Sequence, residues 1–264
     1  MIRSQAHRNF VPPYFIYGAV SVFFCYHLIF WLMDKVLIPR FGTPSFQKNV
    51  NDLEKKKRNS FLTIFPSTVH AAFQSFGVPA YIGLGFSTGH NSEKIAFFDD
   101  KWPAFYQGVF AGYLLADFTK TTTMVYMFHH STAIAAWTLS AYLQSMQWQT
   151  ALLQCCEFST LFFNLRRFLL MAEYDKDGKL MAIVNLLFMV SFGLVRILPL
   201  PMIIRELFAT GFAEMRDKDG LLMAVLGAGF TMIHTALQTT WFSMMVNKLV
   251  FVLLGGSKEK NKIE

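Results

Sequence analysis

The chain has 264 residues, of which 53% are hydrophobic and only 16% are charged. Because soluble domains carry about 25% charged residues, this composition excludes an ordinary water-soluble domain and indicates a protein that folds in lipid. The formal net charge of +7 is not gathered in a basic, aromatic-interleaved segment, so we expect no nucleic-acid partner. Lysines beside the membrane would instead face anionic lipid headgroups.

Long apolar segments predict an all-α integral membrane protein with about seven transmembrane helices, since about 20 apolar residues cross a bilayer. The expected spans are residues 14–38, 61–86, 104–124, 128–148, 150–171, 180–207 and 221–254. Six spans are the alternative, with one segment re-entrant. The first apolar segment is too long for the core of a signal peptide, so we expect it to remain as the first span.

Basic residues alternate between successive connections and thereby predict the orientation in the membrane. The connection after the first span carries Arg40, Lys48 and the basic run 55–58, whereas the connection 87–103 has only two lysines. This pattern places the N-terminus in the lumen and the C-terminal tail in the cytosol. Lys260 and Lys262 of that tail form a Lys-x-Lys-x-x pattern similar to an endoplasmic reticulum (ER) retrieval signal, with a solvated basic tail as the alternative.

Ionisable residues inside the predicted spans are costly, about 2.5–3.5 kcal/mol each on insertion scales, and so indicate an interior site. Asp117 lies near the end of the third span, while His129 and His130 open the fourth, so an antiparallel turn would bring the carboxylate beside an imidazole. Because adjacent helical residues point about 100° apart, only one of the two histidines can face Asp117 squarely. Glu157 in the fifth span is the fourth acid–base candidate.

Further polar residues recur at spacings of three or four within single spans, which places them on one helical face. They predict a polar or amphipathic cavity inside the bundle, lined by His70, Gln74, Thr160, Asn164, Arg196, His234 and Gln238. Hydrogen-bonded packing is the alternative role for His70 and His234. We expect no metal site, because histidines that share a metal on one helix are usually three or four residues apart.

These residues together resemble the TLC (TRAM, Lag, CLN) domain family. The resemblance rests on residues 113–117, His129, His130, 157–160 and 164–166, and residues 57–60 followed by His70 are similar to the type-4 TLC domain-containing proteins. It implies six helices in a barrel-like bundle around a lipid-sized cavity, preceded by an extra helix. The chain would then divide into a first helix with a basic cytosolic loop (1–58), the TLC domain (59–254) and a cytosolic tail (255–264).

Ceramide synthases are related members, which join a fatty-acyl group from acyl-CoA to a sphingoid amine. The resemblance implies that His129 or His130 takes the proton or carries the acyl group, that Asp117 orients the imidazole, and that Glu157 stands where those enzymes have an aspartate. Cys156 and Thr160 depart from that pattern, since the synthases have a histidine and a second aspartate there. Acyl-CoA would be a substrate, with no bound cofactor.

Two functions follow from this reading. The first is an ER enzyme of sphingolipid, ceramide or fatty-acyl metabolism or homeostasis, with an acyl-CoA-dependent transferase site centred on the histidines. The second is a non-catalytic protein that binds lipid, regulates lipid or handles cargo. Membrane lipids are the expected partners in both, and the oligomeric state is left open, with a homodimer as one alternative.

Overall fold

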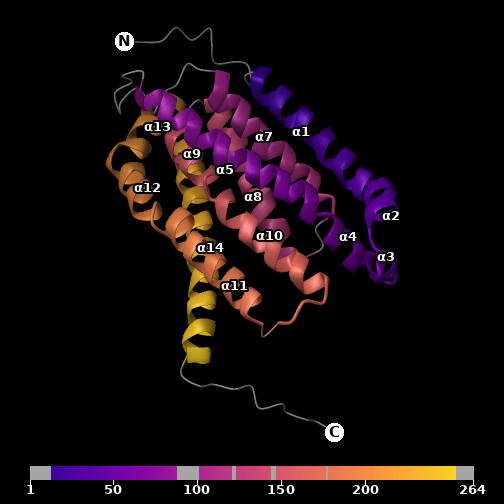
Figure 1. Ribbon diagram of the computed structural model, residues 1–264. Helices are drawn as coiled ribbons and strands as arrows, with labels where there is room; N and C mark the ends of the chain where they lie inside the picture. The colour runs from indigo at the N-terminus through magenta and orange to yellow at the C-terminus, as the bar shows by residue number, and fades with distance from the viewer. Residues whose placement is uncertain (1–12, 88–100, 121–122, 144–146, 177, 254–264) are drawn as a thin grey trace.

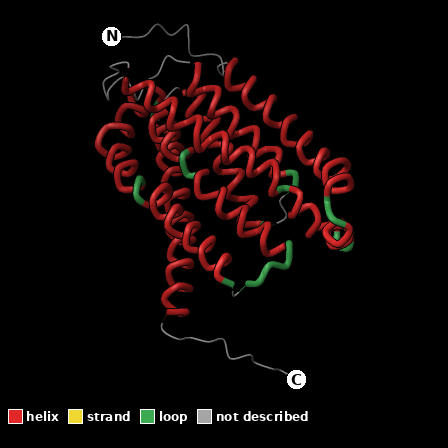
Figure 2. Tube along the Cα trace, in the orientation of Figure 1, coloured by secondary structure: helices red, strands yellow, loops and turns green. Residues whose placement is uncertain are grey.

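The computed structural model describes residues 13–87, 101–120, 123–143, 147–176 and 178–253, which contain helices and no strand. The predicted all-α fold is therefore confirmed. The long helices lie alongside one another in one bundle (Figure 1), and the loops that join the described helices are short (Figure 2). The Lys-x-Lys-x-x pattern and most of the connection 87–103 lie outside the described residues.

Three helical segments in this part of the chain are long and apolar enough to cross a membrane, namely Pro13–Phe41, Lys179–Asp219 and Leu221–Phe251. They correspond to the first, sixth and seventh predicted spans. The remaining predicted spans are also helical. They correspond to α5 (Ile64–Ser87), α7 (Lys101–Phe118), α8 (Met124–Leu143), and α9 (Gln147–Gln154) followed by α10 (Glu157–Met171).

The first helix, α1 (Pro13–Leu32), packs closely along α7. Gly108 and Gly112 lie four residues apart on α7, and a Cβ atom on either would collide with the backbone of Phe15 or Ala19, respectively. A Gly-x-x-x-Gly spacing lets two helix backbones approach this closely. The resulting van der Waals contacts stabilise helix association in a bilayer, where the hydrophobic effect does not favour it. The extra helix is thus an integral part of the bundle.

The predicted basic loop after the first span is itself helical. A π-helical turn (Met33–Leu37) and α2 (Ile38–Phe41) extend α1, and two short helices follow, α3 (Pro44–Asn51) and α4 (Lys55–Leu62). The hydroxyl of Thr43 caps α3 by accepting from the Phe46 N–H at 3.3 Å. Arg58 pairs with Asp34 at 2.7 Å and so ties α4 to the end of the first helical run.

The other long helices contact one another in a closed ring. Helix α5 contacts α7, which contacts α8, and α8 contacts α14 (Leu221–Leu253). Helix α14 contacts α11 (Lys179–Phe192), α11 contacts α10, and α10 contacts α5, which closes the ring. The short helix α9 contacts α5, α7 and α8. One core cluster includes residues of α1, α7, α8 and α9 around Trp137, which is 2% exposed and stacks on Phe110 with ring centroids 4.7 Å apart.

The fifth predicted span, 150–171, is wrong as a continuous helix. The chain breaks between α9 and α10, where the N–H of Cys156 donates to Leu153 O at 3.2 Å and that of Phe158 donates to Cys155 O at 3.1 Å. These i→i−3 bonds satisfy the backbone through the turn without a glycine or proline, so no sequence signal marks the break. As a result, Glu157 occupies the first turn of α10, where the helix dipole favours a carboxylate.

The helical run that contains the sixth predicted span does not end at residue 207. The helical run continues from α11 through α12 (Leu200–Glu206) to α13 (Phe212–Asp219), with π-helical turns at Gly193–Ile197 and Leu207–Gly211. The charged composition of 208–220 suggested a connection, but Met215 is buried in a cluster with Leu207 and Ala224, which holds α13 against α14. Lys218 Nζ also donates to the carbonyl of Leu143 at 2.8 Å.

Candidate functional site

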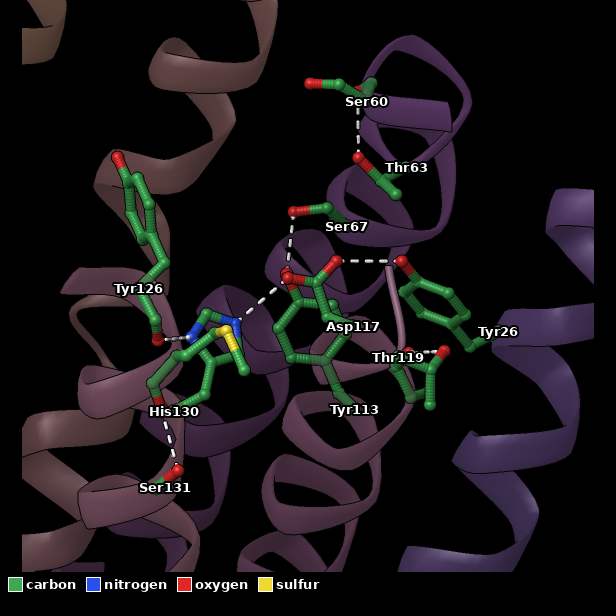
Figure 3. Close-up of polar contacts among 12 residues, drawn as sticks. Tyr26, Ser60, Thr63, Ser67, Tyr113, Asp117, Thr119, Tyr126, His130 and Ser131 are labelled. Carbon is green, nitrogen blue, oxygen red and sulfur yellow. Dashed lines mark hydrogen bonds and ion pairs between the residues drawn. The ribbon is translucent and has the colours of Figure 1, made fainter. Parts of the chain in front are cut away.

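Asp117 joins three helices through one carboxylate (Figure 3). Its Oδ1 accepts a hydrogen bond of 2.8 Å from the hydroxyl of Tyr26 on α1, and its Oδ2 lies 2.9 Å from Nε2 of His130 on α8. The other ring nitrogen of His130, Nδ1, lies 2.8 Å from the carbonyl oxygen of Tyr126. Asp117 and His130 are mostly buried, with side chains 15% and 8% exposed.

These contacts fix the number of protons in the Asp117–His130 pair. A carbonyl oxygen only accepts, so Nδ1 of His130 must carry a proton that it donates to Tyr126. The contact between Nε2 and Oδ2 then needs a second proton, held on the ring or on the carboxyl group. In either arrangement the pair is neutral as a whole, and His130 has no nitrogen lone pair left to act as a base.

His129 points to the other side of α8 and meets a different set of residues. The centroid of its ring lies 5.7 Å from that of the His130 ring, and the two rings are nearly perpendicular at 86°. The His129 ring stacks on that of His234 of α14, with centroids 5.5 Å apart. The rings of Trp241 and His129 meet edge to face, with centroids 5.2 Å apart. Nδ1 of His129 is buried and has no hydrogen-bond partner among the described residues. Of the adjacent histidines, His129 is therefore the one with a ring nitrogen that makes no hydrogen bond within the described residues.

Arg196 organises a second polar cluster beside α10. Its Nε donates to Ser159 Oγ at 2.7 Å, Nη2 to Thr160 Oγ1 at 2.9 Å and Nη1 to Gln238 Oε1 at 3.3 Å. The guanidinium also lies over the ring of Phe192 at 5.0 Å. Arg196 lies in the π-helical turn Gly193–Ile197, and such turns redirect side chains and occur often at functional sites.

The contacts of Arg196 determine the tautomer of His234. A guanidinium only donates, so the atom of Gln238 that faces Arg196 is the amide oxygen and the amide nitrogen faces His234. That nitrogen also only donates, and it lies 3.0 Å from Nε2 of His234. His234 therefore accepts at Nε2, is neutral, and carries its proton on Nδ1. Arg196, Gln238 and His234 form one directed chain of hydrogen bonds that ends at the ring stacked on His129.

Glu157 lies between the two polar clusters. It is 8% exposed, and Arg196, Thr160, His130 and Asp117 are close enough to interact with it electrostatically. The partly buried charge of Arg196 thus has a carboxylate nearby, which offsets the cost of removing it from water. The four predicted acid–base residues gather in one region, with Asp117 and His130 in direct contact.

A third group of polar residues lies between α5, α7 and α10. Ser67 Oγ accepts from Tyr113 Oη at 3.0 Å and from Asn164 Nδ2 at 2.9 Å. His70 is stacked on Tyr113 with centroids 3.9 Å apart, and both of its ring nitrogens are buried without a partner in the described part of the chain. Gln74 is fully buried and donates to the Tyr106 carbonyl at 3.4 Å.

A cavity lies between α8, α9, α13 and α14, and it is partly open to the surroundings. Its wall is mostly apolar, with Trp137, Leu139, Leu143, Leu153, Met215 and Phe230 among the lining residues. His234 also lines it, and the ring of His234 stacks on His129. The cavity therefore reaches His129 only through the ring of His234.

The predicted cavity-lining residues fall into three places. His234 lines this cavity, whereas Thr160, Arg196 and Gln238 form the hydrogen-bonded cluster beside it. The third place, between α5, α7 and α10, holds His70, Gln74 and Asn164.

Sequence reasoning did not identify Tyr26, Trp137 or Trp241 as parts of the site. The Gly108–Gly112 spacing was the available signal for α1 and hence for Tyr26, because it marks a face where another helix can pack.

Residues 10–247 match the TLC domain family, so the chain belongs to that family. The match covers most of the chain and includes α1 as well as the helices that carry Asp117, the histidines and Glu157. Comparison with curated proteins and with solved structures gave no match. Membership of the TLC family, together with the long apolar helices, makes this a membrane protein with a lipid-related function.

Proposed function

We propose that this protein is a multi-pass ER membrane enzyme that transfers a fatty-acyl group from acyl-CoA to a lipid amine, such as a sphingoid base, at a site centred on His129. The observation that carries the proposal is the buried, unpartnered Nδ1 of His129, next to a histidine that lines an apolar cavity. The seven crossings, the lumenal N-terminus and the cytosolic tail are part of the same proposal.

In the proposed acyl transfer, His129 carries the proton from the amine to the leaving thiolate. The amine nitrogen attacks the thioester carbonyl, a C–N bond forms, and His129 takes the proton that the amine loses. The C–S bond then breaks, and the leaving thiolate takes that proton from the His129 imidazolium, which yields the amide and free CoA. The neighbouring Asp117–His130 pair is neutral as a whole, so it does not oppose this transient charge on His129 as a lone imidazolium would.

The likeness to ceramide synthases supports this choice of reaction, and the departures at Cys156 and Thr160 have an explanation in the geometry. Thr160 Oγ1 accepts a hydrogen bond from Arg196 Nη2 at 2.9 Å. Cys156 Sγ donates to the carbonyl of Val195, within the π-helical turn that carries Arg196. Both residues thus serve to hold Arg196, and neither of them has to act on the substrate.

The test is an acyl-transfer assay on protein purified in detergent, with radiolabelled palmitoyl-CoA and sphinganine. His129→Ala should lower amide formation by about 10²–10⁴-fold, the usual contribution of a positioned base. His27→Ala is the matched control, because His27 lies on α1 among Phe23 and Tyr26 and has no part in the proposed chemistry. Unchanged product formation in the His129 variant would refute the proposal.

A non-catalytic lipid-binding function is the second candidate. The observation that favours it is the apolar wall of the cavity, a lining that suits an acyl chain whether or not the histidine reacts. Mass spectrometry of lipids retained through purification separates the two candidates. Bound lipid with no amide formed from any acyl-CoA would establish the second.

A further inference from the structure

The segment that follows the first long helix carries much of the positive charge of the protein. Residues 33–58 contain seven basic and three acidic residues, a net charge of +4, whereas the whole chain has a net charge of +7. They form the π-helical turn Met33–Leu37, α2, α3 and the start of α4, which lie together at one corner of the bundle (Figure 1). Residues 33–58 are called the basic platform below.

The length of the first helical run places the basic platform at the surface of the membrane. Pro13–Phe41 has 29 residues, and at 1.5 Å per residue this run is roughly 43 Å long. The hydrocarbon core of a bilayer is about 30 Å thick, so one end of the run must extend into the headgroup region. Its charged residues, Asp34, Lys35 and Arg40, all lie in its last part, so this is the end that leaves the hydrocarbon.

The basic platform is folded against the bundle and is not an extended loop. Val50 of α3 is 3% exposed and belongs to one apolar cluster with Ile38 of α2 and Phe61 of α4. Arg58 and Asp34 join the start of α4 to the π-helical turn through their contact of 2.7 Å. Because the apolar face of α3 packs on the protein, the face that it leaves outside is polar.

Positive charge dominates the outer surface of the basic platform. Five of its basic residues are exposed, namely Lys35, Arg40, Lys48, Lys55 and Lys57. Two acidic residues are exposed beside them, Asp52 and Glu54, whereas Asp34 is only 14% exposed and is paired with Arg58. Arg40, Lys48 and Lys55 form no ion pair with any residue that the structure describes.

Exposed cations at the depth of the headgroups favour anionic lipids over zwitterionic ones. Phosphate and carboxylate oxygens accept charge-assisted hydrogen bonds from lysine and arginine. Each such side chain near an anionic membrane surface strengthens the attraction by about fivefold. Phe41 is 73% exposed beside Arg40, and an aromatic ring at this depth can contact the upper part of an acyl chain while the cations contact the headgroup.

We propose that the basic platform binds the headgroups of anionic phospholipids, such as phosphatidylserine, in the leaflet that α2 reaches. The packing of α3 and α4 on the bundle holds several cations in a fixed arrangement, so that one headgroup with a phosphate and a carboxylate contacts more than one of them. Binding of this kind does not depend on acyl transfer, because no residue of the basic platform belongs to the site around His129.

The test is a lipid-binding assay on the full-length protein in detergent, with microscale thermophoresis as the readout. Dioctanoyl phosphatidylserine should bind about tenfold or more tightly than dioctanoyl phosphatidylcholine at low ionic strength, since at least two cations contribute. The preference should disappear in about 1 M salt, because the Debye length falls to about 3 Å and the cations are exposed.

Lys48→Gln combined with Lys57→Gln should weaken phosphatidylserine binding by about fivefold for each lysine and leave phosphatidylcholine binding unchanged. The matched control is Arg205→Gln combined with Arg216→Gln, which removes two exposed cations from α12 and α13 at the other end of the bundle (Figure 1). That control should keep the wild-type preference.

Val50→Ser separates a fixed arrangement of cations from charge alone. It keeps every charge but removes the apolar side chain that packs α3 on the bundle, so the preference should fall by about fivefold, as when one lysine contact is lost. Equal binding of the two lipids by the wild type would overturn the proposal, as would an equal loss in the Arg205 and Arg216 control. An unchanged preference in Val50→Ser would overturn the part assigned to the fold of α3.

Discussion

His129 and His130 are neighbours in the chain but belong to regions with opposite properties. The region around His130 joins α1, α7 and α8 through side-chain hydrogen bonds, and both nitrogens of that ring are engaged. The region around His129 joins α8 to α14 through stacked rings, and it includes a buried nitrogen without a partner in the described structure. The difference indicates that the first region holds the helices together, whereas the second has capacity for chemistry.

The largest expected effect is on the first region. Asp117→Ala would leave His130 Nε2 and the Tyr26 hydroxyl without their shared partner, and two buried polar groups left unsatisfied cost about 2–6 kcal/mol together. The free energy of unfolding should fall by that amount in a sodium dodecyl sulfate titration of mixed micelles. Asp217→Ala is the control, because the Asp217–Arg216 pair is exposed and should contribute less than about 1 kcal/mol. Equal stability of the two variants would show that the Asp117 pair is not a structural tie.

A smaller effect is expected when the first region is disturbed without changing its polar groups. Gly112→Ala places a methyl group against the backbone of Ala19, so α1 must move from α7, and overpacking of this kind costs about 1–3 kcal/mol. Gly229→Ala is the matched control, since nothing lies within 4 Å of the added atom there. That control should be neutral or slightly more stable, because alanine is the better helix former. If both variants unfold alike, α1 does not depend on the glycine contact.

The smallest effect concerns the second region. Gln238→Leu removes the link between Arg196 and His234, and losing one such hydrogen bond should cost about 0.5–1.5 kcal/mol. The sharper readout is nitrogen NMR of histidine-labelled protein, in which His234 should no longer be confined to the form protonated at Nδ1. An unaltered His234 spectrum would mean that Gln238 does not set its tautomer. Gln74→Leu should leave the His234 signals in place.

Contacts between close neighbours in the sequence were the most predictable part of the site. Asp117 and His130 are separated by one short turn between antiparallel helices, so their contact follows from helix geometry. The 100° step between adjacent helical residues also anticipates that the two histidines diverge. The contact of His129 with His234 joins positions 105 apart and depends on how α14 packs on α8, which no local pattern specifies.

Helix boundaries were predictable only where composition changes with structure. The break at Cys155 and Cys156 occurs inside an apolar stretch and is satisfied by backbone bonds alone, so composition could not reveal it. Residues 212–219 show the reverse case, since charged side chains suggested a connection while Met215 anchors a helix. Apolar length predicts seven spans, and three of them meet the criteria of length and hydropathy in the described structure.

The glycine contact between α1 and α7 affects where a lipid can move between the bilayer and the interior of the bundle. Where two backbones touch, no acyl chain can pass between the helices, so α1 shields the part of α7 that it covers from the surrounding lipid. Any fatty chain that reaches the interior sideways from the surrounding leaflet must therefore pass between another pair of helices. The cavity between α8, α9, α13 and α14 is open in part, which makes that flank the natural route of entry and exit.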